Sequence, residues 1–95
     1  MGKPEAKVET YLVHEVIKRG GEIRKLEWIG RSGAPDRVAM LQGLTIWVEC
    51  KATGEELQPH QAREIKKMRE RGQWVAVVDS IESVDLLMQR IDTSA

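Results

Sequence analysis

The sequence has a single cysteine, no net charge and no long hydrophobic run, and each shortage excludes a class of protein. One cysteine, Cys50, cannot form an intramolecular disulfide, which is typical of a reducing cytosol. No apolar stretch approaches the ~20 residues that a membrane-spanning helix requires. Residues 1–5 contain no apolar signal-peptide core. We therefore expect a cytoplasmic protein that does not enter a membrane.

The balance of fifteen basic and fifteen acidic residues argues against broad electrostatic attraction to nucleic acid. The basic residues are nevertheless clustered in two segments, Arg24, Lys25, Arg31 and Arg37 in one and Arg63, Lys66, Lys67, Arg69 and Arg71 in the other. If nearby acidic side chains bind a metal, the surrounding face is more positive than the total suggests. A solvated helix of mixed charge is the alternative explanation for the second cluster.

The length of 95 residues predicts one domain that spans 1–95, without a linker, repeat or low-complexity tract. Its core is small, so self-association would help to stabilise it. Hydrophobic periodicity, glycine stops and proline starts predict helices and strands in the order αβββαβα. The helices are expected over 4–19, 58–71 and 81–91, and the strands over 22–29, 37–41, 44–51 and 74–78. The crossover between the last two strands predicts a mixed sheet flanked by helices, an α/β fold.

The turn signal Gln42-Gly43 pairs the strands on either side of it as an antiparallel hairpin. This pairing places Asp36, at the start of the first strand, opposite Glu49, at the end of the second. The two-residue period of a strand puts Lys51 on the same face as Glu49. Trp47 shares that face, where packing in the core is favoured over stacking on a base.

Two carboxylates side by side can bind Mg²⁺ or Mn²⁺ through oxygen. The backbone carbonyl of Cys50, between the two strand positions, is a further candidate ligand. Lys51 could hold an attacking water or stabilise charge on a phosphate. The alternative is a surface salt-bridge network of Asp36, Glu49, Lys51 and Arg37. Gly33-Ala34-Pro35 brings a stiff backbone up to Asp36, which favours a preorganised metal site over the salt-bridge network.

Two polar residues fall on apolar helix faces. Glu9 lies between Val8 and Leu12 on the helical wheel, where it could point at a cation or reach solvent at the edge of the stripe. Gln61 shares a face with Ile65 and could orient Lys51 or a water, or could simply bond to backbone. Candidate substrate contacts close to these positions are Arg31, Arg37 and His60.

Together these residues resemble the VRR-NUC (virus-type replication-repair nuclease) domain, a branch of the PD-(D/E)xK nuclease superfamily. The residues that carry the resemblance are Glu9, Gly33-Ala34-Pro35-Asp36, Glu49-Cys50-Lys51 and Gln61. It implies a restriction-endonuclease-like αβββαβ core, and Mg²⁺- or Mn²⁺-dependent DNA cleavage at a site made of Glu9, Asp36, Glu49, Lys51 and Gln61. It also implies similarity to the stand-alone phage and bacterial members, which resemble the resolvases that act as homodimers on four-way (Holliday) junctions.

Two other functions remain open from the sequence. A non-catalytic DNA- or protein-binding module on the same fold would account for the neutral net charge. The intact acid-x-lysine of Glu49 and Lys51 argues against it, because such a module has no need of every ligand. A toxin or restriction component is a weaker third hypothesis.

Overall fold

The computed structural model of the protein describes residues 4–94. Its elements are α1 (Pro4–Lys18), β1 (Glu22–Lys25), β2 (Arg37–Leu41), β3 (Leu44–Cys50), α2 (Pro59–Glu70), β4 (Trp74–Val78) and α3 (Ile81–Thr93). The order αβββαβα predicted from the sequence is therefore confirmed. None of the helices within residues 4–94 is both long enough and apolar enough to cross a membrane.

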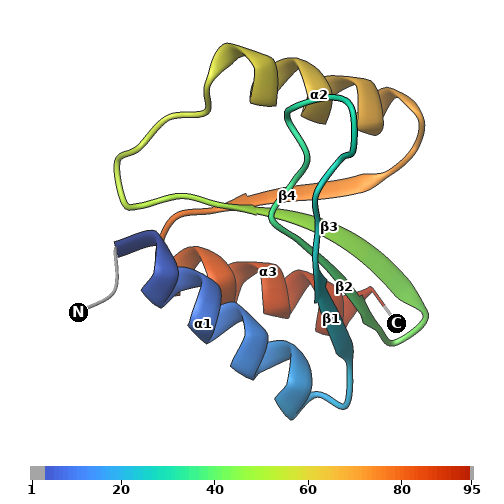
Figure 1. Ribbon diagram of the computed structural model, residues 1–95. Coiled ribbons are helices and arrows are strands. Elements are labelled where there is room, and N and C mark those ends of the chain that lie inside the picture. The colour runs from blue at the N-terminus through green and yellow to red at the C-terminus, as the bar shows by residue number, and fades with distance from the viewer. Residues whose placement is uncertain (1–3, 95) are drawn as a thin grey trace.

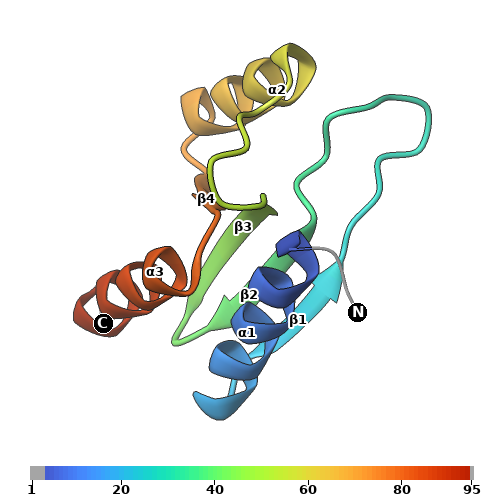
Figure 2. The same ribbon diagram turned by 90° about the vertical axis from the view of Figure 1, so that its left-hand side faces the viewer.

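The four strands form one sheet in the order β1-β2-β3-β4. β1, β2 and β3 are antiparallel neighbours, and β4 runs parallel to β3. Two parallel strands need a crossover connection, which α2 provides. α1 and α3 lie on one face of the sheet and α2 lies on the other (Figures 1 and 2). The predicted mixed α/β sheet flanked by helices is confirmed.

The main core lies between the sheet and the pair α1 and α3. It consists of Val8, Leu12, Val16, Ile23, Ala39, Leu41, Ile46, Val48, Cys50, Val78, Val84, Leu87, Met88 and Ile91. Alternate residues of β3 supply this face, so Ile46 and Val48 are buried here while Trp47 and Glu49 point to the side of α2. The fold thereby separates an apolar face from a face with polar side chains.

The hairpin between β2 and β3 has the tight turn that its sequence predicts. Gln42 and Gly43 both have positive φ, of 53° and 76°, as a two-residue turn of this kind requires. Leu41 and Leu44 are consequently paired across the turn, and Arg37 lies opposite Val48 at the far end. The turn thus sets the register that brings Asp36 to Glu49.

The predicted strand over 22–29 is wrong in its second half, because β1 ends at Lys25. One further bond, from the amide of Leu26 to the carbonyl of Asp36 at 3.0 Å, continues the ladder. The chain then leaves the sheet as a loop over 26–36 that rises to the level of α2 (Figure 2). Smaller shifts occur at helix ends, where α1 and α2 each stop one residue early and α3 continues to Thr93.

Candidate active site

Asp36 is fixed at the end of the hairpin by a bond to the opposite strand. Its Oδ2 accepts from the backbone N–H of Cys50 at 2.8 Å. Because Arg37 is paired with Val48, the preceding residue, Asp36, faces Glu49. The buried ring of Pro35 holds the chain immediately before it. The predicted approach of the two carboxylates is therefore present in the structure.

Glu49 is an acidic residue in a buried position, with only 3% of its surface exposed. Burial raises the pKa of its carboxyl to about 7, and the charge of Asp36 and a hydrogen bond with it act in the same direction. Lys51 opposes this rise. A carboxyl held in this way is poised between its neutral and charged forms near neutral pH.

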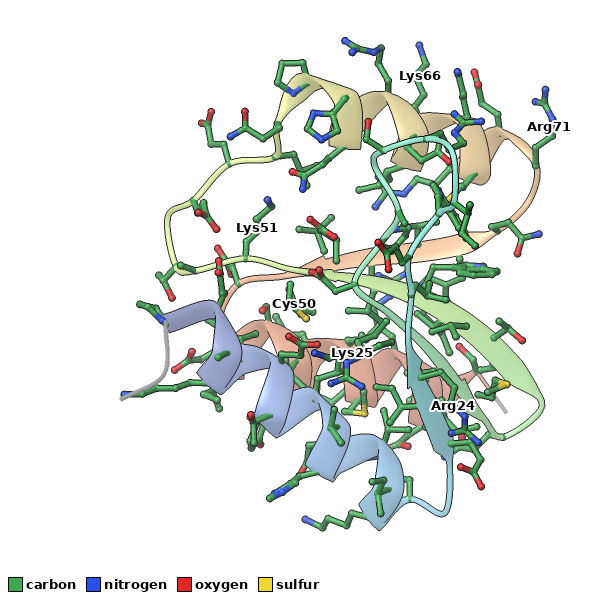
Figure 3. The ribbon with its side chains drawn as sticks, viewed as in Figure 1. Arg24, Lys25, Cys50, Lys51, Lys66 and Arg71 are labelled. Atoms are coloured by element: carbon green, nitrogen blue, oxygen red, sulfur yellow. The ribbon has the colours of Figure 1, made fainter. Side chains whose placement is uncertain are left out.

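Lys51 is also buried, at 9% exposure, and its Nζ lies 3.5 Å from Oε2 of Glu49. Its backbone N–H donates to Val78 at 2.8 Å, which carries the pairing of β3 and β4 one residue further. In Figure 3 the side chain of Lys51 extends toward α2, whereas Cys50 points toward α1 and α3. The pair of Glu49 and Lys51 is too deeply buried to be the surface salt-bridge network considered above.

Glu9 meets a cation, but that cation is an arginine. Its Oε2 accepts from Nε of Arg37 at 2.6 Å, and both side chains are half-buried. Glu9 thus does not lie unpaired at the edge of the stripe. The ion pair joins α1 to the first residue of β2, directly beside Asp36. A contact between Glu9 and a metal stays a prediction.

Gln61 lies in the first turn of α2, and its side chain stabilises that turn. Its Oε1 accepts from the backbone N–H of Gln58 at 2.9 Å. This is the backbone bond considered as the alternative above, and it satisfies an amide at the helix start that has no partner within the helix. The role of orienting Lys51 stays a prediction for the amide nitrogen of Gln61.

The donor set suits a hard divalent cation. Asp36 and Glu49 supply carboxylate oxygens, and Mg²⁺ is commonly held by one or two carboxylates together with waters and substrate phosphates. Residues 4–94 contain no group of three or more His, Cys, Asp or Glu side chains arranged to hold a metal. The thiol of Cys50 lies in the main core, on the side of α1 and α3, and burial raises its pKa. Only the backbone carbonyl of Cys50 is therefore a candidate ligand.

Glu64 is a buried acid near the site that the sequence analysis did not identify. It is 8% exposed, and it accepts from Nε1 of Trp28 at 2.8 Å and from Nη2 of Arg31 at 2.7 Å. These bonds attach the loop over 26–36 to α2. Helical spacing could have identified it, because Glu64 follows Gln61 by three positions and precedes Met68 by four and so shares their inward face of α2.

The predicted basic contacts of the substrate are mostly engaged within the protein. Arg31 is paired with Glu64, and Arg37 with Glu9. His60 is exposed on the first turn of α2 and lines a pocket together with Arg31. The structure brings His60 and Arg31 to one surface, while Arg37 lies next to the carboxylates.

Trp47 lies outside the main core, contrary to the preferred expectation. It shares a small cluster with Trp28 on the α2 side of the sheet, where the ring centroids are 6.2 Å apart. Its Nε1 donates to Oε1 of Gln73 at 2.9 Å. The buried face of β3 is the opposite one, so the two-residue period that places Glu49 on the α2 side excludes Trp47 from the core.

Comparison with known proteins places this arrangement in a family, although no family model matches the sequence. The chain is 44% identical over 84 residues to "Putative nuclease p44" of Acyrthosiphon pisum secondary endosymbiont phage 1, and the match covers 87% of this chain and 90% of that protein. It also superposes on a solved structure described as "VRR_NUC domain" with a TM-score of 0.88 and 38% identity, covering 93% of this chain and 97% of the other. The chain therefore belongs to the VRR-NUC family of nuclease domains.

Proposed function

We propose that this nuclease is a Mg²⁺- or Mn²⁺-dependent endonuclease that hydrolyses phosphodiester bonds in DNA. One observation carries the proposal: Asp36 faces Glu49 at the ends of adjacent strands, and Lys51 lies within 3.5 Å of Glu49. Two acids and a lysine in one cluster are the groups that metal-assisted phosphate hydrolysis needs. The reaction is expected in the cytoplasm, since a phage encodes the relative at 44% identity.

Asp36 and Glu49 would hold the cation on the α2 side of the sheet. The bond that Oδ2 of Asp36 accepts from the backbone N–H of Cys50 fixes this carboxylate beside Glu49, where the two could hold the ion together. A bound Mg²⁺ or Mn²⁺ supplies charge stabilisation at the phosphate and a lower pKa for an attached water. Glu49 must be ionised for this role, so binding is favoured above the pKa of about 7 that it has in the protein alone.

Lys51 would act on the phosphate and the attacking water. Its ammonium group is positioned by Glu49 and directed to the side of α2 (Figure 3). From there it can stabilise the negative charge that grows on the phosphate during attack. Arg37, held by Glu9 at 2.6 Å, is the adjacent positive group and can contact the same strand of DNA. Gln61 would orient Lys51 or the water.

We further propose that the substrate is branched DNA, such as a four-way junction, and that two copies of the chain act together. A junction is resolved by cutting two equivalent strands, which a homodimer with two identical sites can do. The chain covers 90% of the phage nuclease and 97% of the solved domain named above, so the proposal concerns a nuclease domain of about the same size.

The decisive experiment incubates purified protein with labelled four-way junction and linear duplex in Mg²⁺, Mn²⁺ or a chelator. We expect the junction to be cut faster than the duplex, and only with metal. Lys51→Met keeps the volume of the side chain and should lower the rate by at least ~100-fold, the magnitude of losing one stabilising group. Circular dichroism of the variant confirms that it is folded.

Equal cleavage by wild type and Lys51→Met would contradict the proposal. Binding of DNA without cleavage in any metal would instead favour the alternative, a non-catalytic binding module, which the neutral net charge of the chain allows. Asp36→Asn separates the two functions further, because it should abolish metal-dependent cleavage while a binding module would keep its DNA affinity.

A further inference from the structure

A pocket of about 440 Å³ lies between α2 and the loop over 26–36. Its walls are residues 30–32 of the loop and, from α2, His60, Arg63, Glu64 and Lys67. These four helix positions follow the spacing i, i+3, i+4 and i+7 and therefore share one face of α2. We call this hollow the α2 pocket. It is distinct in its residues from the carboxylates and Lys51, although the same loop ends at Asp36.

The α2 pocket has an excess of positive charge. Glu64 is the one acid in its lining, and it already accepts bonds from Arg31 at 2.7 Å and Trp28 at 2.8 Å. The guanidinium of Arg31 offsets the charge of Glu64. Within residues 4–94 the ion pairs of the structure do not involve Arg63 or Lys67. Two cations are thus left for a ligand.

We propose that the α2 pocket binds a phosphate of the DNA backbone other than the one that is cleaved, through Arg63 and Lys67. The inference rests on the proposed function in so far as DNA is the substrate. Arginine and lysine are the side chains that proteins use for phosphate, and a pocket of this volume accommodates a phosphodiester group. The contact fixes the position of the DNA relative to α2 and carries no sequence information.

The location of the α2 pocket gives this contact a consequence for the active site. One wall belongs to the loop that leads into Asp36, and the other to the helix whose first turn contains Gln61. Gly33, with φ of 97°, packs where an added Cβ would lie 3.1 Å from Cβ of Glu64. The loop is therefore close against α2 beside the pocket, and a phosphate bound between them holds both walls in place.

The test measures DNA binding without cleavage, by fluorescence anisotropy of a labelled junction in chelator across 50 to 200 mM salt. The double variant Arg63→Ala/Lys67→Ala is compared with Lys66→Ala/Arg71→Ala, which removes the same charge. Lys66 points away from the sheet and Arg71 lies at the end of α2 (Figure 3). Loss of two phosphate contacts should lower the slope of log affinity against log salt concentration by about 2. The affinity that Arg63→Ala/Lys67→Ala loses relative to the wild type should therefore be roughly tenfold smaller at 200 mM salt than at 50 mM.

The control double variant should keep the wild-type slope. Equal losses in both double variants, or a wild-type slope in Arg63→Ala/Lys67→Ala, would overturn the α2 pocket as a DNA contact and leave the cleavage proposal intact. Cleavage of the junction in Mn²⁺ is measured separately on the same proteins. A wild type that neither binds nor cuts DNA would overturn both proposals.

Inorganic phosphate, titrated into the wild type and followed by the amide signals of α2, distinguishes a DNA phosphate from a free one. Weak binding, with half-saturation above ~10 mM, is expected for a single phosphate that lacks the rest of the DNA. Saturation at micromolar phosphate, with no competition by the junction, would show a small-anion site and would overturn the proposal.

Discussion

Glu49 carries its carboxylate in a position where burial and the neighbouring Asp36 both oppose a negative charge. Its pKa of about 7 in the folded protein lies above the ordinary value of 4.5. The folded state therefore binds this proton more tightly than the unfolded state does. Stabilisation from the protonated carboxyl is complete below about pH 4.5 and is lost as the pH rises through 7.

We predict that the metal-free protein is less stable at pH 8 than at pH 5, by on the order of 1–3 kcal/mol from this group alone. Thermal unfolding in chelator over this range measures the effect. Glu49→Gln has a neutral side chain of similar shape, so its stability should lack this fall. The difference between the two proteins isolates Glu49 from other carboxyls, and a constant difference from pH 5 to 8 would contradict the prediction.

Added Mn²⁺ extends the same experiment. A metal that binds only the folded protein stabilises it, and it requires the ionised carboxylate. The wild type should thus gain stability from Mn²⁺ at pH 8 and much less at pH 5, while Glu49→Gln gains little at either pH.

The contacts of the candidate-site residues differ in how well the sequence alone could predict them. Asp36 and Glu49 were predictable because a two-residue turn and a two-residue period determine which side chains meet. The bond between Glu9 and Arg37 was not, since it depends on how α1 lies across the sheet. The backbone bond of Gln61 is local, and it was considered only as an alternative.

At the scale of elements, the loop over 26–36 is the least regular part of the site and carries Asp36 at its end. The sequence predicted a longer β1, because alternation alone does not mark where a strand leaves its sheet. The decisive contacts, from Trp28 and Arg31 to Glu64, join residues more than thirty positions apart. Such contacts become visible only when α2 is placed over the sheet.

We predict that Glu64→Ala releases this loop from α2. Two donors, on Trp28 and Arg31, would lose their acceptor, at a cost of roughly 1–3 kcal/mol in the free energy of unfolding. Hydrogen exchange at the amides of residues 27–34 should become faster, and cleavage should slow because Asp36 is less firmly positioned. Chemical denaturation and hydrogen exchange by mass spectrometry measure the two effects.

Glu70→Ala is the matched control, since Glu70 is an exposed glutamate in the last turn of the same helix. Its exchange pattern in the loop should equal that of the wild type. Glu64→Gln keeps one oxygen acceptor, so its loop exchange rate should lie between those of Glu70→Ala and Glu64→Ala. Unchanged loop exchange in Glu64→Ala would mean that the loop is held by its other contacts.

At the scale of the whole molecule, the small core and the open sheet edge favour association. β4 is the last strand of the sheet, with Val77 37% exposed and Leu86 of α3 61% exposed. An open edge strand with apolar neighbours is a surface that proteins commonly protect. Self-association is one way to cover such surfaces, and the proposed resolution of a junction would also require it.

We predict that sedimentation equilibrium at micromolar concentration gives twice the chain mass of 10.8 kDa. The functional counterpart uses mixed dimers of wild type and Lys51→Met. One active and one inactive site in each dimer should yield junctions nicked in a single strand. A monomeric mass, or paired cuts from mixed dimers, would contradict a dimer in which each copy cuts one strand.

Asp36 accepts a bond from the amide of Cys50, so the residue proposed to bind the metal also holds the two strands together. Replacement by alanine would remove the acceptor at the open end of the hairpin along with the proposed metal ligand. Replacement by asparagine keeps an oxygen for that amide and removes only the charge. An inactive protein for trapping a DNA complex is therefore best made with asparagine at this position, because loss of activity then does not bring loss of the local fold.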